Sequence, residues 1–194
     1  MALIPAHARR ISVAKRRARH TLAQDEIGDL LVAEARAGHT VVRLKGGDPF
    51  IFGRGGEEVD AALAAGVPVV VIPGISAANG AAASTLMPLT HRDHASMVSF
   101  VAGECRGLAE QNWAGLAGKG RTLVIYMGLA GAAPIAEKLM ADGLAPDTPV
   151  AVVERATQAN ERLVTSLLAD LAGLVAREAI ASPALIIVGD VAAL

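Results

Sequence analysis

The sequence lacks the features that mark several common classes of protein. Its single cysteine, Cys105, excludes an internal disulfide framework and a metal site built from the cysteines of one chain. No apolar run reaches the roughly 18 residues that a membrane span needs, and the apolar start at Met1–His7 is too short for a signal peptide. The formal net charge is only −1, so the overall balance indicates neither nucleic acid nor an anionic membrane as a partner. We therefore expect a soluble protein of the reducing cytoplasm.

Glycine is concentrated in one stretch, Leu44–Glu58, which reads LKGGDPFIFGRGGEE. It follows Val41–Leu44, an apolar and β-branched run that predicts a short buried strand, and it leads into a helix predicted over 57–65. A strand, a glycine loop and a helix in this order are how an open α/β sheet builds a ligand crevice. The alternative is a tight turn that needs positive φ.

This glycine stretch does not have the pattern of a phosphate-binding loop. No Gly-Lys-Ser or Gly-Lys-Thr follows it, and the GxGxxG spacing fails. An acidic residue, Asp48, comes directly after the paired glycines Gly46 and Gly47. This arrangement suits a ribose hydroxyl or an ammonium group better than a phosphate.

A second pattern of strand, turn and helix follows the first. Val69–Ile72 is apolar throughout, as in a parallel strand that is covered on both faces. Pro73–Asn79 then predicts a tight turn and the start of a helix, with Ser76 as a suitable N-cap. Because alanine, glycine and serine crowd residues 76–84, this helix is thin enough for another backbone or a flat ligand to come close.

Basic residues gather near the start of the chain. The cluster, which His7 and His20 flank, consists of Arg9, Arg10, Lys15, Arg16, Arg17 and Arg19. It is interpreted either as a solvated face or as a site for an anion, such as a carboxylate-rich ligand or an RNA backbone. Within it, Ile11–Ala14 predicts a short strand that places Lys15 at or just past the strand's end.

Elsewhere the sequence alternates between helix and strand patterns. A helix is predicted to begin with Thr21 as cap and Gln24 in a capping box, and to end at Gly38. In the second half we expect strands at 96–101, 121–127, 149–153, 161–165 and 184–189, and helices at 107–117, 131–142 and 167–177. The polar segment between Glu154 and Glu161 predicts a hairpin, and hence some antiparallel pairing.

A domain crossing is predicted at 87–94, where a proline and polar residues end the helix pattern. It divides the chain into lobes at 1–90 and 91–194. His91 and His94 in this segment have no further cluster of ligands beside them, so we expect no metal site.

The sequence also gives little support for catalysis by a nucleophilic side chain. Cys105 matches no nucleophile motif, and no Gly-x-Ser-x-Gly occurs. Taken alone, the residues predict an α/β protein of two small lobes with a glycine-lined cleft for a small molecule. They do not name a reaction.

Several segments together carry a resemblance to a known family. They are Val41–Glu58, Val71–Ala77 and Met87–His94, to which the tripeptide 126–128 and the closing strand 184–189 add. With these segments the sequence closely resembles the uroporphyrinogen-III C-methyltransferases of the tetrapyrrole methylase superfamily. The resemblance implies two α/β lobes with a cofactor cleft between them, a mixed sheet in the C-terminal lobe, and a homodimer.

Members of this family transfer methyl groups from S-adenosylmethionine to C2 and C7 of uroporphyrinogen III, giving precorrin-2 on the way to siroheme or cobalamin. Lys15 matches the family lysine assigned to general acid/base work, and the basic cluster then suits a substrate rich in carboxylates. Such a transfer needs alignment of donor and acceptor, and later the loss of a proton. By resemblance, the cofactor-binding residues are Gly46, Gly47, Asp48 and Ile51 around the methionine part, and Ser76, Ala77, Met127 and Ala156 on the adenosine side.

One part of the family pattern is not in the sequence. Members begin with a strand and a Gly-x-Gly-Pro-Gly-Asp-Pro loop, followed by a helix and an Asp-Arg-Leu-Val segment. The resemblance therefore implies that the first strand of the N-terminal lobe is missing, which exposes backbone edges and apolar surface. Two alternatives to an active enzyme stay open. One is a non-catalytic remnant that binds a tetrapyrrole or the cofactor, and the other is a related precorrin methyltransferase, which the string Phe50–Gly56 disfavours.

Overall fold

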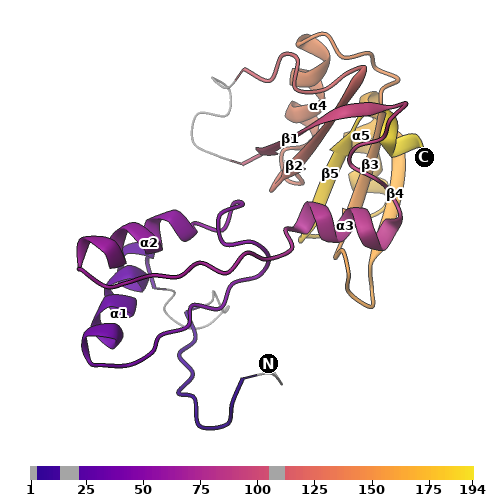
Figure 1. Cartoon of the computed structure of the whole chain (residues 1–194). Coiled ribbons are helices and arrows are strands. Elements are labelled where there is room, and N and C mark those ends of the chain that lie inside the picture. The colour runs from indigo at the N-terminus through magenta and orange to yellow at the C-terminus, as the bar shows by residue number, and fades with distance from the viewer. Residues whose placement is uncertain (1–3, 14–21, 105–111) are drawn as a thin grey trace. The chain divides into compact units, whose positions relative to one another are not determined.

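The chain divides into two compact units, Met1–Gly74 and Ile75–Leu194 (Figure 1). The computed structural model describes residues 4–13, 22–104 and 112–194. The division falls earlier than the boundary after residue 90 that the sequence predicts. The reason is that helix α3 (Ala77–Thr85) and Met87 pack against the sheet of the second unit.

The described part of the first unit is built on two helices, α1 (Gln24–Arg36) and α2 (Gly55–Ala64). The two helices pack closely where Gly28 of α1 faces Ala61 of α2. A Cβ atom added at Gly28 would lie only 3.0 Å from the Cβ atom of Ala61. Both helices were predicted, and their presence is confirmed.

The ends of α1 agree with the prediction only in part. Gly38, with φ of +85°, follows the helix as expected. At the other end the N-cap is Ala23, and its backbone N–H donates to Oε2 of Glu26 at 2.5 Å. Gln24 is therefore the first residue of the helix rather than the partner in a capping box, and Thr21 lies outside the described residues.

Two predicted strands of the first unit do not form. Val41–Leu44 and Val69–Ile72 run without regular secondary structure, and they are exposed rather than buried, with Val42 at 81% and Val70 at 84% exposure. A strand exists only where its backbone groups pair with a neighbouring strand, and neither run is paired as a strand with the described residues of this unit. The strand predicted at Ile11–Ala14 is also absent over 11–13, while Ala14 lies outside the described residues.

The described residues of the second unit form a five-stranded sheet in the order β1-β2-β5-β3-β4. β1 and β2 are parallel, whereas β5 is antiparallel to both of its neighbours and β4 is antiparallel to β3. The predicted strands, the hairpin and the mixed pairing are thus confirmed. The strands are β1 (Ala95–Ala102), β2 (Gly120–Tyr126), β3 (Pro149–Glu154), β4 (Arg162–Leu167) and β5 (Ala184–Val188).

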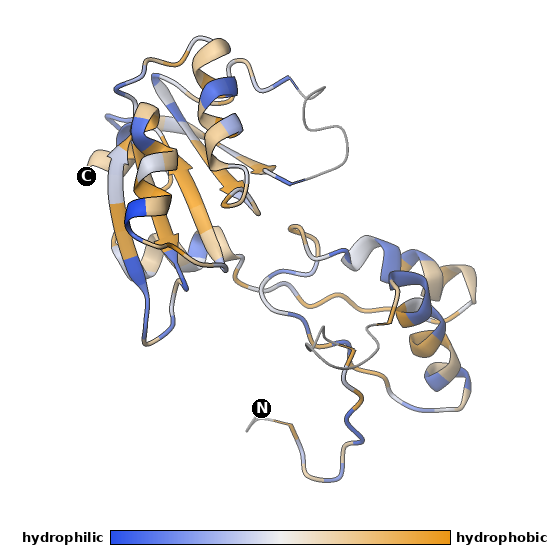
Figure 2. Cartoon of the chain, turned by 180° about the vertical axis from the view of Figure 1, so that it is seen from behind, coloured by the Kyte–Doolittle hydropathy of each residue, from blue (hydrophilic) through white to orange (hydrophobic). Residues whose placement is uncertain are grey.

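Helices cover both faces of this sheet, as the hydrophobic colouring of its central strands in Figure 2 leads one to expect. Alternate residues of each strand point to opposite faces. On β2, for example, Leu123 and Ile125 join the core beneath α4 and α5, whereas Val124 faces α3 and η3. The covering elements are α4 (Ala132–Ala141), η2 (Leu168–Asp170), α5 (Leu171–Arg177) and η3 (Asp190–Ala193).

The helices predicted at 131–142 and 167–177 are confirmed as α4 and as η2 with α5. The helix predicted at 107–117 is not. Its described part, 112–117, forms turns that bring the buried indole of Trp113 into the core, and 105–111, with Cys105, lies outside the described residues.

Replacing Leu139 of α4 by alanine should destabilise the second unit by about 2–5 kcal/mol, because the side chain is fully buried and leaves a cavity. Urea unfolding followed by circular dichroism measures this loss. The control is Leu86→Ala at a position that is 88% exposed, which should change stability by no more than about 0.5 kcal/mol. Equal losses in the two variants would contradict the described core.

Candidate functional site

The structure places the predicted cofactor residues of the first unit in one loop. Asp48 closes this loop, since its Oδ1 accepts the N–H of Phe50 at 2.9 Å and its Oδ2 accepts the N–H of Gly74 at 3.0 Å. The N–H of Gly74, and after it that of Phe50, lower the pKa of the Asp48 carboxyl. The carboxylate thus holds the backbone around Gly46 and Gly47 in shape. Ile51 lies on the same loop and is partly exposed.

Two glycines allow the close backbone contacts on which this loop depends. A Cβ atom on Gly74 would lie 2.5 Å from the carbonyl oxygen of Gly47, and one on Gly55 would lie 2.5 Å from that of Pro49. Neither contact tolerates a side chain. Around Gly46, by contrast, a Cβ atom would meet nothing within 4 Å, so this backbone is open to a ligand on that side.

A largely buried carboxylate supports the loop from α2. Glu58 is 7% exposed, and its oxygens accept hydrogen bonds from Nζ of Lys45 at 3.0 Å, from Nε of Arg43 at 3.2 Å and from Nε2 of Gln24 at 3.2 Å. Burial raises the pKa of Glu58, but the hydrogen bonds from Lys45 and Gln24 and the charge of Arg43 outweigh it and lower the pKa overall. Glu58 therefore fixes Lys45, the residue directly before the paired glycines.

The second set of predicted residues lies at the carboxyl ends of β2 and β3. These strands run in the same direction because both are antiparallel to β5. Met127 follows β2, and Ala156 lies two residues beyond β3 and packs against the core under α3. The structure thus brings both residues to the edge of the sheet at which α/β proteins bind ligands.

The start of α3 is tied to the same edge. The N–H of Ala78 donates to Oη of Tyr126, the last residue of β2, at 3.0 Å. Ser76 is the N-cap of α3, as predicted, but its hydroxyl donates to Oδ1 of Asn79 at 2.6 Å instead of capping a backbone N–H. Ser76 and Ala77, at the start of α3, therefore lie close to the carboxyl end of β2, which Met127 follows.

Left-handed backbone conformations gather around this site. Met127, Arg155 and Thr157 have φ values of 54°, 49° and 67°. Such values are uncommon for residues other than glycine and are strained for β-branched threonine, and they concentrate at functional sites. The strain is held in place on one side by Glu154, which is 2% exposed and pairs with the guanidinium groups of Arg155 at 2.5 Å and Arg162 at 3.2 Å.

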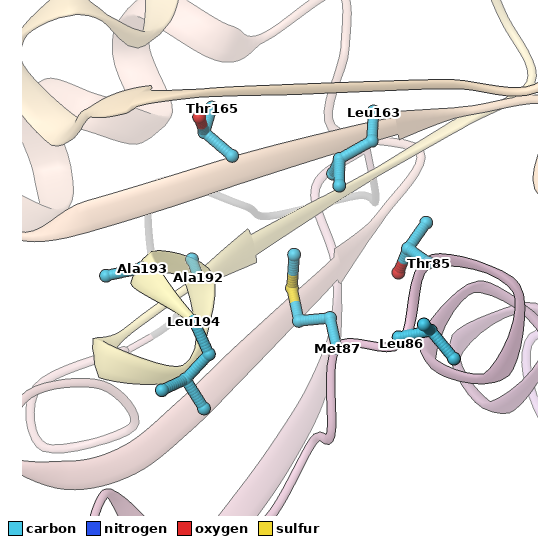
Figure 3. A pocket seen from close by; sticks show the side chains of 8 residues that line it. All are labelled: Thr85, Leu86, Met87, Leu163, Thr165, Ala192, Ala193 and Leu194. Atoms are coloured by element: carbon cyan, nitrogen blue, oxygen red, sulfur yellow. The ribbon is translucent and has the colours of Figure 1, made fainter.

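A cavity of about 360 Å³ in the second unit contains none of the predicted site residues. Met87 and Leu163 point toward one another across it (Figure 3). Its side chains carry no titratable group, and the hydroxyl of Thr85 donates to the carbonyl oxygen of Ala81. The cavity therefore gives no support to a catalytic role for its lining side chains. It is lined by Thr85, Leu86, Met87, Leu163, Thr165, Ala192, Ala193 and Leu194.

The remaining predicted residue, Lys15, lies outside the described residues, as do Arg16, Arg17 and Arg19 of the basic cluster. Of the described members, Arg9 forms an ion pair with Glu34 of α1. Over 4–13, 22–104 and 112–194, no group of three or more His, Cys, Asp or Glu residues is arranged to hold a metal ion. In the same ranges, every helix is too short or too polar to cross a membrane.

Comparison with known proteins identifies the family. The sequence profile described as Tetrapyrrole (Corrin/Porphyrin) Methylases matches residues 2–172. The chain belongs to the tetrapyrrole methylase family. It is 51% identical, over 193 residues, to siroheme synthase from Tolumonas auensis, an alignment that covers 99% of this chain but only 41% of that protein.

Two solved structures of tetrapyrrole methylases resemble the fold. The uroporphyrin-III C-methyl transferase from Thermus thermophilus, complexed with S-adenyl homocysteine, is 41% identical and has a TM-score of 0.72, over 87% of this chain and 74% of that one. A cobalt precorrin-4 methyltransferase is 25% identical with a TM-score of 0.79, over 88% of this chain and 72% of that one. This chain thus spans about two fifths of its curated relative's length and most of the length of these enzymes.

Residue types and spacing did not single out the carboxylates that hold the two sets of family residues in shape. Glu58 lies in the helix predicted over 57–65, and Glu154 borders the segment predicted to form a hairpin. Their partners Arg43 and Arg162 are 15 and 8 residues away in sequence. A weak signal was available, since a glutamate on an otherwise apolar helix face or strand end implies a buried cationic partner.

Glu58→Gln in α2 should lower stability at pH 7 by about 2 kcal/mol, because hydrogen bonds to a charged, nearly buried carboxylate are lost. The pKa of Glu58 is lowered in the folded chain. Its contribution is therefore fully present above the ordinary glutamate pKa and is lost as pH falls through the lowered value. Thermal unfolding at pH 7 and at pH 3 should show the difference from wild type shrink in acid. Glu57→Gln, at an exposed neighbour, is the control, and an equal effect there would refute the network.

Gly74→Ala should destabilise the first unit by about 1–3 kcal/mol, because the added methyl group collides with the carbonyl oxygen of Gly47. It should also break the hydrogen bond from Gly74 to Asp48. The matched control is Gly56→Ala, where a Cβ atom meets nothing within 4 Å and the position is helical. That variant should gain about 0.5–1 kcal/mol. Urea unfolding of both variants tests the loop, and a neutral Gly74→Ala would disprove its described packing.

Proposed function

We propose that the chain is an S-adenosylmethionine-dependent C-methyltransferase that converts uroporphyrinogen III to precorrin-2 by methylation at C2 and C7. The reaction serves siroheme or cobalamin biosynthesis, and the active form is a homodimer. The observation that carries the proposal is the 41% identity to the Thermus uroporphyrin-III C-methyl transferase over 74% of its length. The 51% identity to a siroheme synthase supports the same substrate.

The described residues fit the cofactor chemically. The bound cofactor supplies the methyl group as a sulfonium electrophile. Gly46, Gly47, Asp48 and Ile51 bind its methionine part, with Asp48 acting by shaping the backbone that the open side of Gly46 presents. Ser76, Ala77, Met127 and Ala156 bind the adenosine part, and the small side chains of Ser76, Ala77 and Ala156 suit a flat base.

The chain's own catalytic contribution is alignment and proton transfer. An electron-rich pyrrole carbon needs no strong nucleophilic side chain to attack a sulfonium methyl group, so positioning dominates. We assign general acid/base work in the methyl transfer to Lys15, on its match to the family lysine. The basic residues around it, of which Arg10 is an exposed member, suit the carboxylates of the substrate.

A second candidate is a non-catalytic protein that binds the cofactor or a tetrapyrrole. The observation that favours it is the exposure of Val41–Leu44 and Val69–Ile72, which form no strand with the described residues of the first unit. A cobalt precorrin methyltransferase is less well supported, since the identity to that enzyme is only 25%.

Calorimetric titration of the purified chain with S-adenosylhomocysteine tests the proposal. We expect one site per chain with affinity in roughly the micromolar range. Lys15→Ala should bind equally well and should lose on the order of 10²-fold or more in methylation of uroporphyrinogen III. Binding without any methylation by the wild-type chain would favour the non-catalytic candidate. A folded chain that binds nothing would refute both the enzyme and a cofactor-binding remnant.

A further inference from the structure

The loop between β3 and β4, residues 155–161, is docked onto α3 at two points. The methyl group of Thr157 reaches α3 at Gly80, where a Cβ atom would lie only 3.3 Å from it. One helical turn further along, the hydroxyl of Ser84 donates to Oε2 of Glu161 at 2.5 Å. Gly80 and Ser84 are four residues apart and therefore share one face of the helix.

Glu161 joins the loop and the helix through a single oxygen atom. The same Oε2 accepts the backbone N–H of Thr157 at 2.5 Å, so that one carboxylate closes the loop on itself and attaches it to α3. The hydrogen bonds from Ser84 and from the N–H of Thr157 lower the pKa of Glu161.

The loop needs such a restraint. Arg155 and Thr157 are both left-handed, and Ala156 lies between them. Two strained residues so close together keep their conformation only where several surrounding contacts hold it in place. Glu154 supplies these contacts at Arg155, whereas for Thr157 the contacts come from Glu161 and from the close approach of Gly80.

We infer that Glu161 is a positioning residue for the adenosine side of the cofactor site. It holds Ala156, on the loop, at a fixed distance from Ala77, at the start of α3. The inference rests on the proposed function, because it is the cofactor that these two alanines are proposed to contact. Glu161 itself touches neither the cofactor nor the reacting atoms.

The test compares Glu161→Ala with Glu161→Gln in the full chain. Alanine removes both hydrogen bonds and should raise the dissociation constant for S-adenosylhomocysteine roughly tenfold. Glutamine keeps an oxygen that accepts both bonds and should restore the affinity to within about threefold of wild type. Ser84→Ala, which frees only the α3 end, should lie between the two. The matched control is Glu137→Ala, at an exposed position of α4 beneath the other face of the sheet.

Hydrogen exchange provides a readout that needs no ligand. The amide hydrogen of Thr157 should exchange faster in Glu161→Ala, return close to the wild-type rate in Glu161→Gln, and be unchanged in Glu137→Ala. Circular dichroism melting verifies that each variant is folded. Should Glu161→Ala fail to fold, Ser84→Ala and Glu161→Gln carry the comparison.

The outcomes separate the two claims. If wild type binds and Glu161→Ala binds equally well, the positioning role is refuted while the proposed function stands. An unchanged exchange rate at Thr157 in Glu161→Ala refutes the restraint itself. If the folded wild-type chain binds no S-adenosylhomocysteine, the proposed function fails, and Glu161 then has no cofactor to position whatever the exchange rates show.

Discussion

The pairing of β5 with β2 on one side and β3 on the other is the constraint on which the second unit depends. Because β5 is antiparallel to both, β2 and β3 must run in the same direction and end at the same edge of the sheet. This places Met127 and Ala156 at the same edge of the sheet although they are far apart in sequence. The hydrogen bond from Ala78 to Tyr126 then attaches the start of α3 to that edge. The candidate site is therefore a consequence of strand direction.

In the described part of the first unit, two apolar runs without a strand partner stay irregular. Val41–Leu44 and Val69–Ile72 have sequences as suited to strands as those of β2 or β5, and both run exposed. Their backbone groups find no strand partner among the described residues of the unit. The loop after Leu44 is ordered by side chains instead, through hydrogen bonds to the carboxylates of Asp48 and Glu58. Polar contacts thus give this loop its shape where a sheet does not.

Carboxylates hold three irregular segments around the candidate site. Asp48 closes the glycine loop, Glu154 holds Arg155, and Glu161 holds Thr157 against α3. In each case the acceptor oxygens satisfy backbone N–H groups or guanidinium groups that a regular helix or strand does not pair. A carboxylate is well suited to this task, because its two oxygens accept several strong hydrogen bonds at once. None of the three takes part in the proposed methyl transfer itself.

Periodicity in the sequence determined the strands of the second unit, and its helices α4 and α5, to within a few residues, because these apolar patterns match surfaces that are in fact buried. Motifs such as Lys45-Gly46-Gly47-Asp48 determined the family and, through it, the candidate residues. Only the tertiary structure decided that Val41–Leu44 is not a strand, that residues 112–117 are not a helix, and that α3 packs with the second unit. It alone also revealed the roles of Glu58, Glu154 and Glu161. Each of these outcomes depends on contacts that form only in the folded chain, and local sequence pattern carries no information about whether those contacts are made.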